Sequence, residues 1–567
     1  MREYKKYAWS GLLCIGVEVV LEITVPLLMA DLIDYGVTNA DGTYIIKKGL
    51  QMALCAVSAL ILGVGSAKFS ALAGQGLGAN IRKAEYEKLQ SYSFSNIDHF
   101  SVSSLVTRLT SDVTNIQNAV STGMRPFGRS PVMLIFATSF AFRINSTLAL
   151  VFLVALPTLA VLLILIIINV GPLYGRMQSA IDQVNRCIQE NLTAIRVVKS
   201  YVRGNYEVEK FGVVNENLKS ESEKAFGTAV LNMPAMQFVM YGTILGILLI
   251  GGRLINEGQM MIGQLTSFLS YVLLILNSLM MMSNVFLLMT RSLASAERIM
   301  EVIDEKIDIT DENAKDIAVA KGEIEFDHVW FKYKDTAKEY VLSDVSFHIK
   351  PGQTVGIIGQ TGSSKTTLVQ LIPRLYDVTK GEVKIDGINV KEYPVRHLRD
   401  AVAMVLQKNT LFSGSLIDNL RWGNENATLD EIKEACQIAC VDEFVDRLAD
   451  GYDTEMGQEG VNVSGGQKQR ICIARAILKK PKVLILDDST SAVDTATEAK
   501  IRSGLAEKLP DMTKIIIAQR ISSVRHADQI IIMDRGHVEA IGTHESLLRD
   551  NQIYQEIYAS QKEGADL

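Results

Sequence analysis

Long apolar runs dominate roughly the first half of the chain, and shorter alternating patterns follow them. Three of the runs contain no Asp, Glu, Lys or Arg: residues 144–175, 225–252 and 259–290. Each exceeds the roughly 20 apolar residues that a helix needs to cross about 30 Å of hydrocarbon. Weaker runs lie at residues 8–33, 49–76 and 127–142. We therefore predict about six membrane-spanning helices.

The segments between the runs predict how these helices are oriented. Short polar turns alternate with two long, charged, helix-prone connections, at 80–125 and 176–224. Basic loops and termini stay in the cytoplasm, and the chain starts with Arg2, Lys5 and Lys6. An even number of spans then leaves both termini cytoplasmic. We expect a multi-pass protein of the cell membrane, embedded in the lipid bilayer.

From about residue 321 the chain changes to short β runs that alternate with helical periodicity. The β runs read GEIEFDHVWF, TVGIIG, KVLILD and KIIIA, and this alternation is typical of a soluble α/β domain. We predict a transmembrane domain with long intracellular helices at 1–290, a charged connector at 291–320 and an α/β domain at 321–567.

Composition argues against nucleic-acid binding, a disulfide framework and a zinc site. The chain has 567 residues, too many for one compact domain, and its net charge of −6 provides no basic surface for nucleic acid. Nucleic acid is therefore not an expected partner. The six Cys are scattered without a CxxC pair, so neither a disulfide framework nor a zinc site is indicated.

One β run leads into a loop and helix that read GIIGQTGSSKTTLVQL, the setting of a phosphate-binding P-loop. Lys365 would neutralise the β- and γ-phosphates of ATP, and the Thr366 hydroxyl would reach Mg²⁺. Ser364 departs from the usual pattern, because the second Gly of the motif is expected there; a Cβ crowds a backbone that must approach phosphate closely. A glycine-rich loop that arose by chance is the alternative. The candidate nucleotide-binding residues are Gly359, Gln360, Thr361, Gly362, Ser363, Ser364, Lys365, Thr366 and Thr367.

A second candidate anion surface lies in NVSGGQKQRICIARAIL. Ser464, Gly465, Gly466 and Gln467 open a helix, whose bare N–H groups favour an anion. One nucleotide cannot touch both this surface and its own P-loop if they lie far apart in the fold. Two such domains that face each other head to tail would solve that geometry.

VSGGQ, placed between a P-loop and LILDD, resembles the signature of the ATP-binding-cassette (ABC) family. The apolar runs before it are similar to exporters that fuse a membrane domain and a nucleotide-binding domain in one half-transporter. The resemblance implies a six-span α-helical domain followed by an α/β P-loop nucleotide-binding domain. It also implies ATP and Mg²⁺ as cofactors, and coupling helices near 98–104 and 200–211.

The resemblance assigns roles to further residues. Tyr333 would stack on adenine, although an aromatic residue of the core reads the same in sequence. Gln407 would sense Mg²⁺ and water, and Asp487 would be the metal-site aspartate. Asp494 would end a loop, residues 491–494, that crosses to the other subunit's site.

Two departures from the family pattern concern catalysis. The family's general base is Glu, but this chain has Asp488, which is shorter by one methylene, about 1.5 Å of reach. The family's γ-phosphate His is Gln519 here, in AQR. Together with Ser364 these residues would converge on one nucleotide, while Ser464–Gln467 stay intact. The pattern resembles the catalytically impaired subunit of heterodimeric multidrug exporters.

The leading hypothesis is therefore a translocating ATPase that works as one half of a heterodimer. Its partner would be a second half-transporter with Glu and His at the catalytic positions, and its substrate a hydrophobic or amphipathic small molecule. A homodimeric exporter with slow chemistry is one alternative. An ATP-gated regulatory subunit without turnover is another.

Ionisable residues inside the first apolar run are candidates for substrate contact. Glu18 and Glu22 lie four residues apart, on one helix face. They would contact a cationic substrate or, alternatively, pair with Arg or Lys from a neighbouring span or extend to the membrane interface. Methionines of the last run fit a promiscuous cavity or ordinary packing equally well: Met280, Met281, Met282 and Met289.

Overall fold

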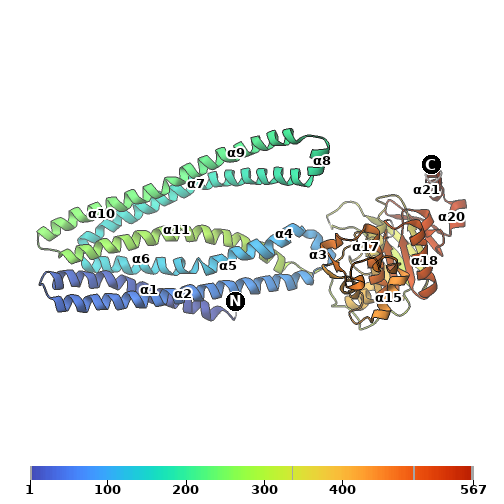
Figure 1. Ribbon diagram of the computed structural model, residues 1–567, viewed down its shortest axis with the longest axis horizontal. Coiled ribbons are helices and arrows are strands. Elements are labelled where there is room, and N and C mark those ends of the chain that lie inside the picture. Colours follow the sequence, from blue (N-terminus) through green and yellow to red (C-terminus); the bar gives the residue numbers. More distant parts are fainter. Residues whose placement is uncertain (1–2, 335, 490–491, 564–567) are drawn as a thin grey trace. The chain divides into compact units, whose positions relative to one another are not determined.

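The computed structural model describes residues 3–334, 336–489 and 492–563, and the chain divides into two compact units. The first, here called the helical unit, comprises Met1–Gln90 and Ser103–Asp304 (Figure 1). The second, the α/β unit, comprises Ser91–Val102 and Glu305–Leu567. A short segment from the early part of the sequence thus belongs with the later domain.

Long helices make up the helical unit. They are α1 (Lys5–Asp31), α2 (Gly42–Gln90), α6 (Met124–Ile144), α7 (Ser146–Thr193), α9 (Gly204–Val230), α10 (Asn232–Asn256) and α11 (Ile262–Asp304). Each of the six predicted apolar runs lies largely in one or two of them. Helix α11 also continues through residues 291–304, which the sequence analysis assigned to the connector.

Among the described residues, four helices are long and apolar enough to cross a membrane: Lys5–Val37, Gly42–Gln90, Gly204–Asn256 and Ile262–Met282. Ser146–Leu162, at the start of α7, is a shorter apolar helix. Many large apolar side chains on these helices are exposed, as a lipid-facing surface requires. The number of six spans stays a prediction.

The helices of this unit pack around an apolar core that includes Ile15, Met133 and Phe268 from α1, α6 and α11. Phe152 of α7 stacks on Phe268, with ring centroids 5.4 Å apart. The buried Tyr271 hydroxyl donates to the backbone carbonyl of Ile23, at 2.7 Å. This bond satisfies a polar group that would otherwise be stranded among apolar side chains.

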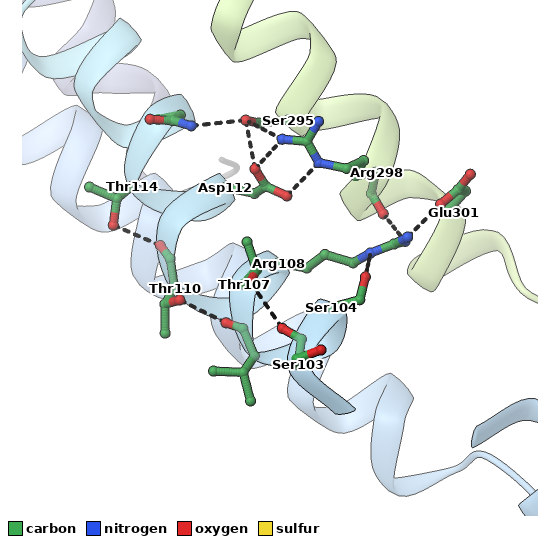
Figure 2. Close-up of polar contacts among 12 residues, drawn as sticks. Ser103, Ser104, Thr107, Arg108, Thr110, Asp112, Thr114, Ser295, Arg298 and Glu301 are labelled. Carbon is green, nitrogen blue, oxygen red and sulfur yellow. Dashed lines mark hydrogen bonds and ion pairs between the residues drawn. The ribbon is translucent and has the colours of Figure 1, made fainter. Parts of the chain in front are cut away.

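A polar network ties the π-helical turn η2 (Arg108–Asp112) to α11 beyond the apolar core (Figure 2). The buried Asp112 carboxylate accepts from Arg298 Nε at 2.8 Å and from Ser295 Oγ at 2.9 Å. Arg108 donates to the backbone carbonyl of Arg298 at 2.6 Å and pairs with Glu301 at 2.7 Å. Because Arg298 stabilises the ionised carboxylate, the pKa of Asp112 lies below its ordinary value.

Two main sheets and one short antiparallel pair, β7 (Gly414–Ser415) with β8 (Glu455–Met456), form the described part of the α/β unit. The larger has the order β12-β11-β3-β10-β9-β6, and all its neighbours run parallel except the antiparallel pair β12 and β11. The smaller, antiparallel sheet has the order β2-β1-β4-β5. The larger comprises β12 (His537–Gly542), β11 (Gln529–Asp534), β3 (Thr354–Ile358), β10 (Thr513–Ile517), β9 (Val483–Asp487) and β6 (Val402–Val405); the smaller comprises β2 (Leu342–Ile349), β1 (Ile324–Phe331), β4 (Lys380–Ile385) and β5 (Ile388–Asn389).

The central strands β9 and β10 are buried along their whole length, as expected of parallel strands covered on both faces. Their register pairs Asp487 with Ile517, and Ile517 with Ile357 of β3. The carboxyl ends of these three strands therefore lie side by side at one edge. Ligands of α/β proteins bind at this edge, outside the carboxyl ends of the strands.

The segment Ser91–Val102 contains helix α3 (Phe94–His99), which overlaps the first predicted coupling segment. A capping box of Ser93 and Asn96 begins the helix. Asp98 accepts a hydrogen bond of 2.6 Å from the hydroxyl of Tyr376, and Phe94 meets the same ring edge-on at 6.0 Å. These contacts explain why the segment belongs to the α/β unit.

The Asp112 network predicts a specific loss of stability. Asp112→Ala leaves Arg298 and Ser295 without their acceptor, so we expect unfolding to become easier by about 2 kcal/mol. Because the pKa of Asp112 is lowered in the folded state, this contribution is complete above the ordinary carboxyl pKa of about 4 and is lost as the pH falls through the folded value. Thermal unfolding in detergent measures the change. Thr114→Ala is the matched control, since Thr114 bonds only the exposed carbonyl of Thr110; an equal loss in both variants would contradict the assignment.

Candidate functional site

The P-loop connects β3 to helix α12 (Lys365–Gln370), at the carboxyl edge of the large sheet. Ser364 has a left-handed backbone, with φ +71°. A non-Gly residue in this conformation costs about 1–2 kcal/mol, and Gly avoids that cost. The sequence analysis expected Ser364 to crowd phosphate; the structure adds that Ser364 holds a strained backbone where the family motif has Gly.

Lys365 lies across its own loop. Its ammonium donates to the carbonyls of Gly359 at 2.8 Å and Gln360 at 2.9 Å, and to Ser363 Oγ at 3.3 Å. Burial lowers the pKa of Lys365, while the charges of Asp488 and Asp487 oppose that shift. An ammonium group at the start of α12, in a glycine-containing loop after a strand, suits the terminal phosphates of a nucleotide.

Asp487 ends β9 and has the properties of a Mg²⁺ ligand. Its Oδ1 accepts from the Thr366 hydroxyl at 3.0 Å, while its Oδ2 is buried and has no hydrogen-bond partner. Burial is the main cause that raises the pKa of Asp487. A carboxylate and a hydroxyl are hard oxygen ligands, and Mg²⁺ commonly completes its shell with water and nucleotide phosphates. The residues therefore fit the ion, which would supply charge neutralisation at the phosphates.

A cavity of about 310 Å³ brings most of the predicted nucleotide-site residues together. Its walls are Thr361, Gly362, Ser364, Lys365, Thr366, Thr367, Gln407, Asp487, Asp488, Ile517 and Gln519. They come from the P-loop and the first turn of α12, from the ends of β9 and β10 with the residues that follow them, and from the loop after β6. Sequence motifs separated by more than a hundred residues thus line one space.

Tyr333 lies beside this cavity. Its hydroxyl is 2.9 Å from Thr367 Oγ1, and its ring meets the edges of Phe331 and Tyr376. The residue is 44% exposed, which leaves ring surface available for stacking. A base can use such a surface, because every base has a π-face.

The two residues that depart from the family's catalytic pattern contact each other. Gln519 Nε2 donates to Asp488 Oδ2 at 2.9 Å. Asp488 also has a left-handed backbone, with φ +47°, and its N–H donates to the carbonyl of Ile517 at 3.1 Å. Burial raises the pKa of Asp488, and the Gln519 bond and the Lys365 charge oppose the rise. Sequence reasoning expected both residues near one nucleotide but did not predict that they pair.

Ser464, Gly465, Gly466 and Gln467 begin helix α17 (Gly465–Leu478), outside the cavity. Ser464 and Gln467 form a capping box, with Ser464 N–H donating to Gln467 Oε1 at 2.8 Å. A Cβ on Gly466 would lie 2.7 Å from the carbonyl of Ala492, so the close approach of the next loop requires Gly there. Asp494 accepts from Thr497 N–H at 2.9 Å and caps α18 (Thr495–Lys508). Ser491, predicted in the same loop, lies outside the described residues.

A second cavity, of about 700 Å³, lies in the helical unit among α1, α2, α6 and α11. Glu18 pairs with Arg125 at 2.6 Å and with Arg129 at 3.2 Å, and Glu22 pairs with Arg129 at 2.6 Å. Gly63 faces this cluster, since a Cβ there would lie 3.2 Å from Arg125 and from Glu18. The structure thus shows the pairing that the sequence analysis gave as the alternative.

Sequence reasoning missed Arg125 and Arg129. A signal was present, because these residues are four apart and match the spacing of Glu18 and Glu22 on the facing helix. No methionine of the last run is among the residues that line the described cavity. Met280 packs against the core of the helical unit, whereas Met281, Met282 and Met289 are 44%, 46% and 49% exposed.

Comparison with known proteins agrees with this geometry. A family model described as "ABC transporter transmembrane region" matches residues 9–279, and one described as "ABC transporter" matches residues 342–491. A Bacillus subtilis (strain 168) protein named "Uncharacterized ABC transporter ATP-binding protein YfiB" is 38% identical over 568 residues, which cover 100% of this chain and 98% of that protein. The chain belongs to the ABC transporter family.

Other relatives carry more specific names. An "ATP-dependent lipid A-core flippase" of Pseudomonas putida is 33% identical over 85% of this chain and 79% of its own length. A "Putative multidrug export ATP-binding/permease protein YgaD" of Bacillus subtilis is 32% identical over 85% of this chain and 83% of its own length. A solved "Structure of a bacterial Atm1-family ABC exporter with ATP bound" superimposes with a TM-score of 0.84, at 23% identity and 98% coverage of both chains. The last comparison supports the fold.

These findings confirm the family and the fold class predicted from the sequence, a helical membrane domain followed by an ABC nucleotide-binding domain. The roles of individual residues in this ABC transporter stay predictions, as do the domain boundaries.

The Thr366–Asp487 contact predicts how this ABC transporter depends on Mg²⁺. Thr366→Val removes the hydroxyl and weakens Mg·ATP binding about 10-fold, because a hydrogen bond to a charged group is worth about 1.5–3 kcal/mol. Thr366→Ser keeps the hydroxyl and stays within about twofold of the wild type. Isothermal titration with ATP, with and without a chelator, measures both. If Thr366→Val binds metal-free ATP as poorly as Mg·ATP, the loss arises from the loop and not from the metal.

Proposed function

We propose that this ABC transporter exports hydrophobic or amphipathic small molecules across the cell membrane, driven by ATP, as one half of a heterodimer. The observation that carries the proposal is the bond between Gln519 and Asp488, at the two positions where the family has His and Glu. Both positions lie in the nucleotide cavity. The neighbouring parts of the site, Lys365, Thr366 and Asp487, keep the groups that bind Mg·ATP.

Asp488 is poorly suited to activate water. A general base must come within about 2.6–3.2 Å of the proton that it takes, and Asp is about 1.5 Å shorter than Glu. In addition, one Asp488 oxygen already accepts from Gln519. A Gln amide can bond a phosphate oxygen but cannot carry the positive charge of an imidazolium. We therefore infer that this site holds ATP and turns it over slowly or not at all.

The signature residues support a role for this chain in a partner's site. Ser464–Gln467 open α17 with a complete capping box, and Gly466 retains its required close approach to Ala492. A partner with Glu and His at the catalytic positions would hydrolyse ATP against this surface. ATP binding would favour the closed pair of nucleotide domains, and hydrolysis at the partner's site would release it, a population shift set by differential affinity.

The membrane cavity fits an amphipathic substrate. Most of its walls are apolar, from Val25, Ala56, Leu60, Val64, Leu273 and Leu274, and one side carries the cluster of Glu18, Glu22, Arg125 and Arg129. The relatives named as a lipid A-core flippase and a multidrug exporter are consistent with this class. Glu22 is the more exposed acid, with 33% of its side chain accessible against 7% for Glu18. We assign substrate contact to Glu22 and a mainly structural role to Glu18.

A homodimeric exporter with slow chemistry is the second candidate. One observation favours it, because Asp488 is still a carboxylate that lines the nucleotide cavity. An ATP-gated subunit without turnover is the third. Purified chain that splits ATP briskly by itself, and loses that activity in Asp488→Asn, would replace the heterodimer by the homodimer.

Two variants of the heterodimer separate the two composite sites. Asp488→Asn should leave at least about half of the ATPase activity, since the partner's carboxylate does the chemistry. Ser464→Arg should reduce activity by about 100-fold or more, because a bulky cation blocks the surface that the partner's nucleotide needs. Steady-state phosphate release from reconstituted heterodimer measures both. Lys468→Ala, at a partly exposed position of the same helix, serves as the control, and the reverse ranking of the first two variants would contradict the proposal.

Neutralising one acid that lines the cavity tests substrate contact. Glu22→Gln should weaken transport of cationic amphiphiles about 5–10-fold while neutral ones are unaffected, because it removes an acid that faces the cavity. Transport into inverted vesicles, with a matched pair of cationic and neutral dyes, measures the difference. Asp31→Asn is the control, since Asp31 lies on α1 like Glu22 but pairs with Lys48 of α2 and does not line the cavity. Equal effects on both dyes would show a structural role for Glu22.

A further inference from the structure

The C-terminal helix α21 (Gln552–Glu563) reaches the loop that carries Gln519. The Gln561 amide makes two hydrogen bonds to the backbone on either side of Arg520. Its Nε2 donates to the carbonyl of Gln519 at 2.7 Å, and its Oε1 accepts from the N–H of Ile521 at 2.8 Å. One side chain thus brackets the loop between β10 and helix α19 (Ile521–Val524).

Helix α21 is itself firmly held. Tyr554 is completely buried, and its hydroxyl lies 2.8 Å from His544 Nδ1. Ile557 and Tyr558 pack against the same core cluster as Tyr554. Positions 554, 557, 558 and 561 share one face of a helix, so the burial of Tyr554 also directs Gln561 towards the loop. The contact therefore rests on an anchored element.

The loop has two fixed ends and a functional side chain between them. On the side of β10, Ala518 N–H donates to the carbonyl of Ile357. On the other side, Gln561 holds Gln519 and Ile521. Between these points the Gln519 side chain extends to Asp488, at 2.9 Å. A shift of about 1 Å at the backbone of residue 519 would break that bond, because hydrogen bonds weaken steeply outside their geometry.

We propose that Gln561 is a positioning residue, which aims Gln519 at Asp488 and makes α21 a determinant of how tightly this chain's own site holds ATP. The inference rests on only one part of the proposed function, ATP binding at this site. Gln519 and Asp488 share the cavity with Lys365, the group that serves the β- and γ-phosphates. Loss of their alignment should therefore affect ATP more than ADP.

Nucleotide titration of the full chain in nanodiscs tests the proposal. Gln561→Ala should weaken Mg·ATP binding about 10-fold, because the hydrogen bond between Gln519 and Asp488 is no longer aligned. Binding of Mg·ADP should stay within about twofold of the wild type. Gln555→Ala is the matched control. Gln555 is the same residue type on the same helix, but its amide bonds the carbonyls of Leu548 and Arg549. Equal losses for ATP and ADP, no loss for either, or the same ATP loss in the control would each overturn the proposal.

Hydrogen exchange directly measures the contact between the Gln561 side chain and the loop backbone. The amide of Ile521 donates to Gln561, so its exchange should become at least about 10-fold faster in Gln561→Ala and stay unchanged in Gln555→Ala. Unchanged exchange at Ile521 in Gln561→Ala would overturn the proposal even if binding were weakened.

Gln561→Glu adds a pH signature that a purely structural role would not produce. The carboxylate still accepts from Ile521 but faces the carbonyl of Gln519, so ATP binding should be weak at neutral pH. Protonation restores a donor, and binding should recover as the pH falls, since an acceptor opposite a carboxylate raises the carboxyl pKa. ATP binding by Gln561→Glu that does not change with pH would contradict the proposal. If the wild-type chain fails to bind ATP, the proposed function is wrong. If the wild-type chain binds ATP and Gln561→Ala does not change that binding, only this inference is wrong.

Discussion

The parallel register of β3, β10 and β9 is the constraint on which the nucleotide site depends. Ile357, Ile517 and Asp487 are paired across these strands, so the chain after each strand emerges at the same edge. This register brings together the P-loop, the pair Asp487–Asp488 and Gln519. A slip of one residue in β9 would turn Asp487 from its predicted metal position to the opposite face of the sheet.

The bond between Gln519 and Asp488 changes how the departures from the family pattern are understood. Asp488 without Gln519 would leave unfilled the space that a longer Glu side chain would occupy. Gln519 without Asp488 would offer only a weaker contact to phosphate than His. Together they form a satisfied pair, in which a long amide reaches the shorter carboxylate. Burial raises the pKa of Asp488 and the amide counteracts it, so the pair also limits the cost of placing an acid there. The two residues are better explained as one local solution than as separate losses.

Sequence reasoning predicted the elements with strong local signals and missed contacts between elements. Apolar runs identify the membrane helices, and the P-loop and VSGGQ identify the nucleotide domain, because each signal lies within about 30 consecutive residues. Residues 291–304 looked like a connector because they are charged, yet Arg298 and Ser295 use that polarity to bind Asp112 (Figure 2). Nothing in the periodicity of 91–102 indicates that α3 belongs with a domain more than two hundred residues later.

The contacts of α3 would give the proposed low-turnover site a physical role. Tyr376 bonds Asp98 and meets Phe94 on one side, and its ring meets the edge of Tyr333 at 5.2 Å on the other. A base stacked on Tyr333 would thus lie one aromatic ring from the predicted coupling helix. We expect that occupancy alone, without hydrolysis, would shift this cluster, since closely packed side chains transmit strain. A nucleotide that stays bound would then act on α3 as a lasting ligand, and in the proposed heterodimer the partner's site would hydrolyse ATP.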